Sequence, residues 1–204
     1  MRLPRRLISV LDWLLAATIL VFAGLSPVPA NAQMKFLKDL KKGIQERTSP
    51  DAVFVGKHFR CLVPKKWELK KSEDGLFLAG PGKDALLPPK IAVDYYGAGN
   101  PSFKDADDYL QTNRDGGIPL KDEKTGPIEK MRVAQLPAKG FFRDTFEYIP
   151  PNSLHPVKVP VREEYIVLPY GDGFFVLVYS TQASSYRLYY PVFQRLVDSF
   201  HPLP

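Results

Sequence analysis

Short runs with apolar residues at every second position dominate the chain after residue 58, and they predict β-strands. In the first run, Phe59, Cys61 and Val63 occupy alternate positions, and Pro64 ends it. Runs of similar character cover residues 67–70, 76–79, 90–96, 128–136, 140–149, 159–168 and 174–181. Most connections between these runs are short, which favours antiparallel pairing. We therefore expect seven or eight strands in a mostly antiparallel sheet.

The last run, over residues 174–181, is apolar at both alternating sets of positions, so both of its faces need covering layers. A terminal helix can supply one layer. Its apolar residues share one helical face: Tyr189, Phe193, Leu196, Val197 and Phe200. Because proline is best tolerated in the first turn of a helix, Pro191 predicts a start near Tyr189 or Tyr190.

A second helix is expected to begin at Ser102, whose side-chain oxygen suits an N-cap, and to end at Asp115-Gly116-Gly117. Asp105, Asp107 and Asp108 then lie near the positive end of its dipole, which explains this acidic group better than a calcium site does. Helices on both faces of an antiparallel sheet predict an α+β protein, an α/β/α sandwich with about seven strands.

The first thirty-two residues have the pattern of a secretory signal peptide. Three arginines precede an apolar run from Trp13 to Leu25, and Ala30-Asn31-Ala32 is a small-x-small cleavage site before Gln33. The alternative is a retained membrane anchor, but a bilayer needs about 20 apolar residues. We expect an exported protein, periplasmic or extracellular after cleavage near Ala32. The pair Arg5-Arg6 leaves both the general and the twin-arginine export routes open.

Residues 34–46 predict a short amphipathic helix, with Met34, Leu37, Leu40 and Ile44 on one side and lysines on the other. Such a helix caps a domain, or lies on an anionic membrane surface as a peripheral contact. Thr48 to Asp51 reads as a linker. The expected organisation is a signal peptide over 1–32, a helix and linker over 33–52, and one domain over 53–204.

Composition narrows the possible functions. Hydrophobic residues make up 45% of the chain and charged residues 25%, which is typical of a globular domain. One cysteine excludes an intramolecular disulfide, and three histidines offer little for a metal site. The signal peptide carries three arginines and one aspartate, so its removal lowers the net charge from +6 to +4. The basic pairs are separated along the chain, and we expect no nucleic-acid partner.

Two motifs carry a resemblance to a known family. The opening Phe59-x-Cys61-x-Val63-Pro64-x-x-Trp67 and the closing Phe193-x-x-Leu196-Val197-x-Ser199-Phe200 resemble the PsbP-like group, over about residues 53 to 202. That group includes exported bacterial relatives and shares its sandwich with the Mog-type Ran-binding protein. The resemblance implies a non-enzymatic binding or assembly role. It transfers no binding residue and no photosystem function.

The chemically versatile residues have plain structural interpretations. Cys61 shares its strand face with Phe59 and Val63 and is expected in the core. The three histidines, at 58, 155 and 201, lack metal-ligand spacing. Glu163 and Glu164 are adjacent in a strand, so their side chains should point to opposite faces and cannot form a catalytic pair. We predict no catalytic residue, no metal and no cofactor.

The remaining candidates for binding are aromatic residues near loops. Exposed rings beside loops 80–90 and 150–160 would form a contact surface, although core and rim packing also accounts for them. The predicted binding residues are Tyr95, Tyr96, Tyr109, His155 and Tyr170. We expect an exported binding or assembly domain with a protein partner in the cell envelope. The alternatives are a small-ligand or lipid carrier and a small hydrolase using residues such as Asp172 and His201.

Overall fold

The computed structural model describes residues 51–82, 86–115 and 122–204. The predicted signal peptide, the cleavage site near Ala32 and the helix over 34–46 with its membrane contact lie outside the described residues. No helix in the described part of the chain is long and apolar enough to cross a bilayer.

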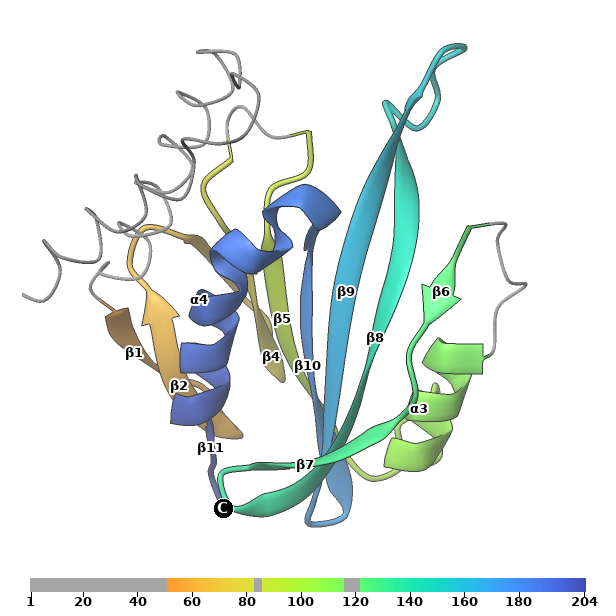
Figure 1. The fold of residues 1–204 in the computed structure, drawn as a ribbon. Helices are drawn as coiled ribbons and strands as arrows, with labels where there is room; N and C mark the ends of the chain where they lie inside the picture. The colour runs from red at the N-terminus through yellow and green to blue at the C-terminus, as the bar shows by residue number, and fades with distance from the viewer. Residues whose placement is uncertain (1–50, 83–85, 116–121) are drawn as a thin grey trace, which may run out of the picture. The chain divides into compact units, whose positions relative to one another are not determined.

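An eight-stranded antiparallel sheet forms the centre of the domain (Figure 1). Its strand order in space is β3-β4-β5-β10-β9-β8-β6, and β7 pairs with one end of β8. In chain order the strands are β3 (Glu68–Lys71), β4 (Gly75–Ala79), β5 (Lys90–Tyr96), β6 (Lys124–Thr125), β7 (Glu129–Val133), β8 (Leu136–Ile149), β9 (Val157–Tyr170) and β10 (Gly173–Gln182). The predicted fold class is confirmed.

The largest departure from the predicted strands lies between β7 and β8. We expected one strand over 128–136 and another over 140–149, with a break at residues 137–139. The turn instead lies at Ala134 and Gln135, which adopt φ values of 51° and 66°. A two-residue turn of this kind matches the twist of the strands that it joins. Pro137 therefore lies inside β8, opposite Arg132.

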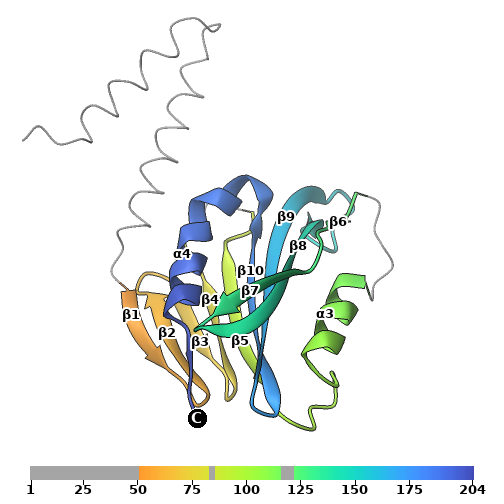
Figure 2. The ribbon, with the colours of Figure 1, turned by 60° about the horizontal axis from the view of Figure 1, so that its bottom comes forward.

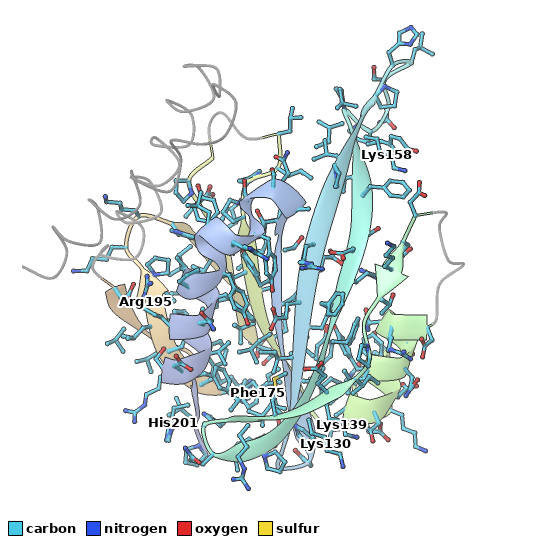
Figure 3. The ribbon with its side chains drawn as sticks, viewed as in Figure 1. Lys130, Lys139, Lys158, Phe175, Arg195 and His201 are labelled. Atoms are coloured by element: carbon cyan, nitrogen blue, oxygen red, sulfur yellow. The ribbon has the colours of Figure 1, made fainter. Side chains whose placement is uncertain are left out.

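A second sheet of three strands lies beside the first, in the order β1-β2-β11. Its strands are β1 (Asp51–Val55), β2 (Phe59–Pro64) and β11 (His201–Pro202). The sequence patterns predicted only β2. Asp51, interpreted as the end of a linker, begins β1 and accepts a hydrogen bond of 3.1 Å from Nε of Arg195 (Figure 3).

The terminal helix α4 (Tyr186–Ser199) covers one face of the large sheet and follows a short 3-10 turn, η1 (Ala183–Ser185). Beneath it, Phe175, Leu177 and Tyr179 of β10 are fully buried. The predicted start near Tyr189 or Tyr190 is wrong, since α4 begins at Tyr186 and holds Pro191 inside. Proline withholds one hydrogen bond from the carbonyl of Arg187, which is an exposed residue on the solvent side.

Helix α3 (Ala106–Asp115) packs on the opposite face of the large sheet (Figure 2). Its Tyr109 and Leu110 contact Phe174 and Val176 of β10, so β10 is buried on both faces as predicted. The predicted cap at Ser102 is wrong. The side chain of Asp105 accepts the hydrogen bond from the backbone N–H of Asp108, at 2.9 Å, and caps the helix instead.

Cys61 is buried in β2, as its position in the alternating pattern predicted. It belongs to the core beneath α4, together with Phe59 and Val63 of the same strand face. Burial raises the pKa of its thiol to about 12. Because the thiolate is the reactive form, Cys61 is held in an unreactive state.

A candidate binding groove beside the long hairpin

The hairpin of β8 and β9 extends beyond the rest of the sheet, and its upper half is not covered by α4 (Figure 1). A cavity of about 540 Å³ lies there, lined by residues of β6, β8, β9, η1 and the first turn of α4. A second cavity of about 130 Å³ shares Arg162 and Tyr186 with the first and reaches Met131 in β7. We call the two cavities together the hairpin groove.

Arg162 of β9 lies at the junction of the two cavities. Its guanidinium donates two hydrogen bonds to Asp144 of β8, at 2.6 and 2.7 Å. The guanidinium carbon also lies 4.9 Å from the ring centre of Phe142 and 5.4 Å from that of Tyr186. Hydrogen bonding to Asp144 is the largest cause of the raised pKa of Arg162. The planar cation is thus fixed in position between a carboxylate and two aromatic rings.

Glu164 lies two residues further along β9 and connects the sheet to α4. Its carboxylate accepts hydrogen bonds from the hydroxyls of Tyr186 and Tyr190, the latter at 3.2 Å. Burial, followed by the charge of Glu164, raises the pKa of Tyr190 to about 12, and burial also raises that of Tyr186. Both phenols are therefore neutral donors near pH 7.

The hairpin end of the groove is rich in positive charge. Lys158 of β9 pairs with Asp122 at 2.8 Å, and its amine lies 3.9 Å from the ring centre of Phe146. Lys124 and Arg187 line the same cavity and are exposed. Neither of these two side chains forms an ion pair or a hydrogen bond with another described residue.

The groove depends on a close approach at Gly126, in the segment between β6 and β7. The N–H of Gly126 donates a hydrogen bond of 2.8 Å to the carbonyl of Phe142. A Cβ atom at this position would lie 2.4 Å from the ring of Phe142. Only glycine at position 126 therefore lets this segment pass over the ring of Phe142 without displacing that ring.

The tip of the hairpin exposes apolar side chains beyond the groove. Leu154 is 94% exposed, Val157 54% and Tyr148 48%. Lys158, labelled in Figure 3, lies on β9 next to this tip and lines the groove as well. The tip and the groove are thus neighbouring parts of one surface.

On the opposite face of the hairpin, Glu163 belongs to a separate polar cluster. Arg143 of β8 donates two hydrogen bonds to one of its oxygens, at 2.8 and 2.7 Å, and Tyr165 donates a third at 3.0 Å. Glu164 meanwhile contacts the tyrosines of α4. The prediction that Glu163 and Glu164 point to opposite faces is confirmed.

The predicted binding residues are not gathered in one place. Tyr95 and Tyr170 both contact Phe175 on the face covered by α4. Tyr96 and Tyr109 contact each other on the α3 face, where Tyr109 is buried. His155 is exposed in the loop of the hairpin tip. Of the five residues, only His155 belongs to the β8–β9 hairpin, and it lines neither cavity of the groove.

Sequence patterns did not single out the groove residues. Asp144, Arg162 and Glu164 read as the polar positions of two strands, which usually face solvent. The available signal was the number of charged residues in both strands, interspersed with aromatic residues from Phe142 to Tyr148 and clustered at Arg162, Glu163 and Glu164 in the second. It becomes informative only when the strand register is known.

Asp172 and His201, the residues named for the alternative hydrolase hypothesis, lie in different elements of the fold. Asp172, in the turn between β9 and β10, accepts a hydrogen bond of 3.4 Å from the hydroxyl of Tyr95. His201 lies in β11 opposite Arg60 and is exposed, far from the hairpin end where Lys158 lies (Figure 3). In the ranges that the structure describes, no group of three or more His, Cys, Asp or Glu side chains is arranged to hold a metal ion.

No protein-family model and no curated protein matches the chain. Several solved structures resemble it in fold. LpqN of Mycobacterium tuberculosis, described as involved in cell envelope biogenesis, has 14% identity and a TM-score of 0.48, over 76% of this chain and 91% of LpqN. Cyanobacterial PsbP from Synechocystis has 9% identity and a TM-score of 0.47, over 76% of this chain and 94% of PsbP. The Ran-binding protein Mog1p of Saccharomyces cerevisiae has 11% identity and a TM-score of 0.47, over 76% of this chain and 96% of Mog1p. A PsbP protein and a Mog1 protein are thus both among the solved structures that resemble this chain in fold.

Proposed function

We propose that this protein is an exported, non-enzymatic binding domain that docks onto a protein partner of the cell envelope. The docking surface consists of the tip of the β8–β9 hairpin and the hairpin groove. One observation carries the proposal: the tip exposes Tyr148, Leu154 and Val157 beside a groove that is lined by aromatic rings and fixed charges.

The surface has the composition of a protein interface. Interfaces combine apolar anchors at their centre with a polar rim, and tyrosine and arginine are enriched among the residues that dominate the binding energy. Here the anchors project on a hairpin and the groove supplies Tyr186 and Arg162. Asp144 holds Arg162, and two tyrosines hold Glu164. These side chains are preorganised to make contacts, which lowers the entropic cost of binding.

Export is supported by the N-terminal pattern of a basic segment, an apolar run and a small-x-small site. When the full chain is expressed in a bacterium, we expect the protein to be recovered from the periplasm or medium with Gln33 as its first residue. N-terminal sequencing and cell fractionation measure this directly. Ala30→Arg/Ala32→Arg should block the cleavage. Full-length protein retained in the membrane fraction would contradict the proposal and favour a permanent anchor.

A non-enzymatic role is supported by the hydrogen bonds that the charged side chains of the groove make with their neighbours. Asp144, Arg162 and Glu164 each hydrogen-bond to neighbouring side chains, in arrangements that suit structural support. Activity screening of the purified protein tests the hydrolase alternative. Robust turnover that disappears in His201→Ala or Asp172→Asn would contradict a purely binding role.

A small-ligand or lipid carrier is the second candidate, and the groove volume favours it. A cavity of about 540 Å³ lies within the range of about 300 to 1,000 Å³ that is usual for small-molecule sites. Native mass spectrometry distinguishes a small-ligand or lipid carrier from a domain that docks onto a protein. A stoichiometric co-purified lipid or metabolite that is lost in Phe146→Ala/Tyr186→Ala would replace the protein-docking proposal.

Site-specific crosslinking tests the docking surface. A photoreactive phenylalanine analogue placed at position 154 should give a discrete crosslinked product with an envelope protein, because Leu154 is 94% exposed at the tip. The same analogue at position 70, which is exposed on β3 at the other edge of the sheet, is the matched control. Val157→Asp should abolish the product from position 154. Equal products from both positions, or a product that Val157→Asp leaves unchanged, would contradict docking through the hairpin.

A further inference from the structure

The charges in the larger cavity of the hairpin groove do not balance. Four cationic side chains line it: Lys124, Lys158, Arg162 and Arg187. Asp122 and Asp144 are its two acidic residues, and each forms an ion pair with one of those cations. Lys124 and Arg187 therefore add two positive charges that no described residue offsets.

The smaller cavity has the opposite charge. Glu129 and Glu164 line it, and Arg162 is its cationic residue, already paired with Asp144. The groove is thus positive at the hairpin end and negative toward β7. An anionic group is attracted to the hairpin end and repelled from the other, so the charge pattern fixes the direction in which a ligand lies.

Aromatic rings line the larger cavity together with the two cations that pair with no described residue. Phe146 and Tyr186 line the same cavity as Lys124 and Arg187. An exposed ion pair alone contributes little to binding, so a free anion gains little here. A ligand that joins a carboxylate to an apolar or aromatic group contacts both parts of the cavity and binds more tightly.

From this arrangement we propose that the groove binds an acidic, extended segment of the partner protein. A carboxylate side chain of the segment lies between Lys124 and Arg187, and a neighbouring aromatic or apolar side chain packs on Phe146 and Tyr186. The inference rests on the proposed function. The exposed apolar tip lies next to the groove, and a polypeptide can contact the tip and the groove at the same time. It adds the chemistry by which the partner is recognised.

Two labelled synthetic peptides of equal length test this inference on the full chain. Both alternate charged residues with phenylalanine, but one carries glutamate and the other carries lysine. Fluorescence anisotropy should show binding of the glutamate peptide and much weaker binding of the lysine peptide. The difference should shrink as ionic strength rises past about 0.15 M, where the Debye length is about 8 Å. Equal affinity for both peptides would overturn the proposal.

Charge reversal locates the site. Lys124→Glu/Arg187→Glu should weaken binding of the glutamate peptide about tenfold, which corresponds to about 1.4 kcal/mol, because two attractive exposed charges are replaced by two repulsive ones. Lys65→Glu/Lys66→Glu changes the net charge equally at two exposed residues away from the groove and is the matched control. All four side chains are exposed, so the melting temperature of both variants should stay close to that of the parent. Equal loss in both variants would show nonspecific attraction and overturn the site.

Two further outcomes separate this inference from the proposed function. If N-acetylglutamate or inorganic phosphate binds as tightly as the glutamate peptide, the groove is a small-anion site and the inference fails. If the peptides do not discriminate while the crosslink from position 154 forms as expected, hairpin docking stands and the acidic segment is wrong.

Discussion

Replacing Phe200 by alanine is expected to lower the free energy of unfolding by about 3 to 5 kcal/mol, the usual cost of deleting a buried aromatic ring. Phe200 follows α4 and is only 2% exposed. Its ring centre lies 5.3 Å from that of Phe59 and 5.1 Å from that of Phe175. One side chain therefore joins α4, the small sheet and the large sheet, and its removal leaves a cavity where the three meet.

Trp67→Ala is expected to cost a similar amount, because the indole is buried against Tyr189 of α4, with ring centres 6.1 Å apart. For a domain of this size the loss corresponds to a fall of roughly 6 to 20 °C in Tm. Chemical denaturation and calorimetry measure both effects. Leu154→Ala is the control and should change stability by less than about 0.5 kcal/mol. If Phe200→Ala and Trp67→Ala both melt with the parent, the core between α4 and the sheets is wrongly assigned.

Arg143→Met is expected to lower the free energy of unfolding by about 2 to 3 kcal/mol, because it leaves a largely buried carboxylate without its cation. Only 16% of the Glu163 side chain and 26% of the Arg143 side chain are exposed. The guanidinium also donates to the hydroxyl of Tyr165, at 2.7 Å, and to the carbonyl of Asn113 in α3, at 3.3 Å. The loss therefore affects both the β8–β9 pairing and the attachment of α3.

Two further variants test the reason for this loss. Lys139→Met breaks the ion pair with Asp107. The side chain of Lys139 is 40% exposed and that of Asp107 is 67% exposed, so the free energy of unfolding should fall by at most about 1 kcal/mol. Arg143→Met/Glu163→Gln removes the uncompensated charge and should recover part of the stability lost in Arg143→Met. If Arg143→Met is as stable as the parent, or if Arg143→Met/Glu163→Gln is less stable than Arg143→Met, the structural role of the Arg143–Glu163 pair is contradicted.

The strands were predictable where the burial of side chains follows one regular pattern along a single segment. In β2 the buried Phe59, Cys61 and Val63 occupy alternate positions because successive side chains point to opposite faces. In β10 the buried positions are consecutive, and the predicted double burial holds because α4 and α3 cover opposite faces. In both strands the pattern reflects an environment that repeats along a single segment.

The turns and helix ends were harder because several local signals competed there. The predicted strands left a break at residues 137–139, but Pro137 pairs with Arg132 inside the ladder, and Ala134 and Gln135 take the positive φ values of the turn. For α3, both Ser102 and Asp105 are suitable caps. The helix begins after Asp105, and the side chain of Asn100 instead accepts the hydrogen bond from the N–H of Ser102.

The hairpin groove illustrates a different limit. Asp144 and Arg162 are far apart in the sequence, and each has the character of an ordinary exposed residue of a strand. The antiparallel register places them directly opposite each other and places Glu164 beside the tyrosines of α4. Their contact with each other arises from pairing between segments, so neither strand alone carries the information.

By itself the sequence determined the β-rich fold class, the buried face of β2 and of α4, the burial of β10 on both faces, the core position of Cys61 and the opposite orientations of Glu163 and Glu164. These properties follow from the spacing of side chains along one strand or helix, which is a local quantity. Only the tertiary structure decided the strand order, the partners of Arg143, Arg162 and Glu164, and the groove with its two cations that pair with no described residue. These depend on which distant segments pair and in what register, and that choice is made by the packing of the whole domain.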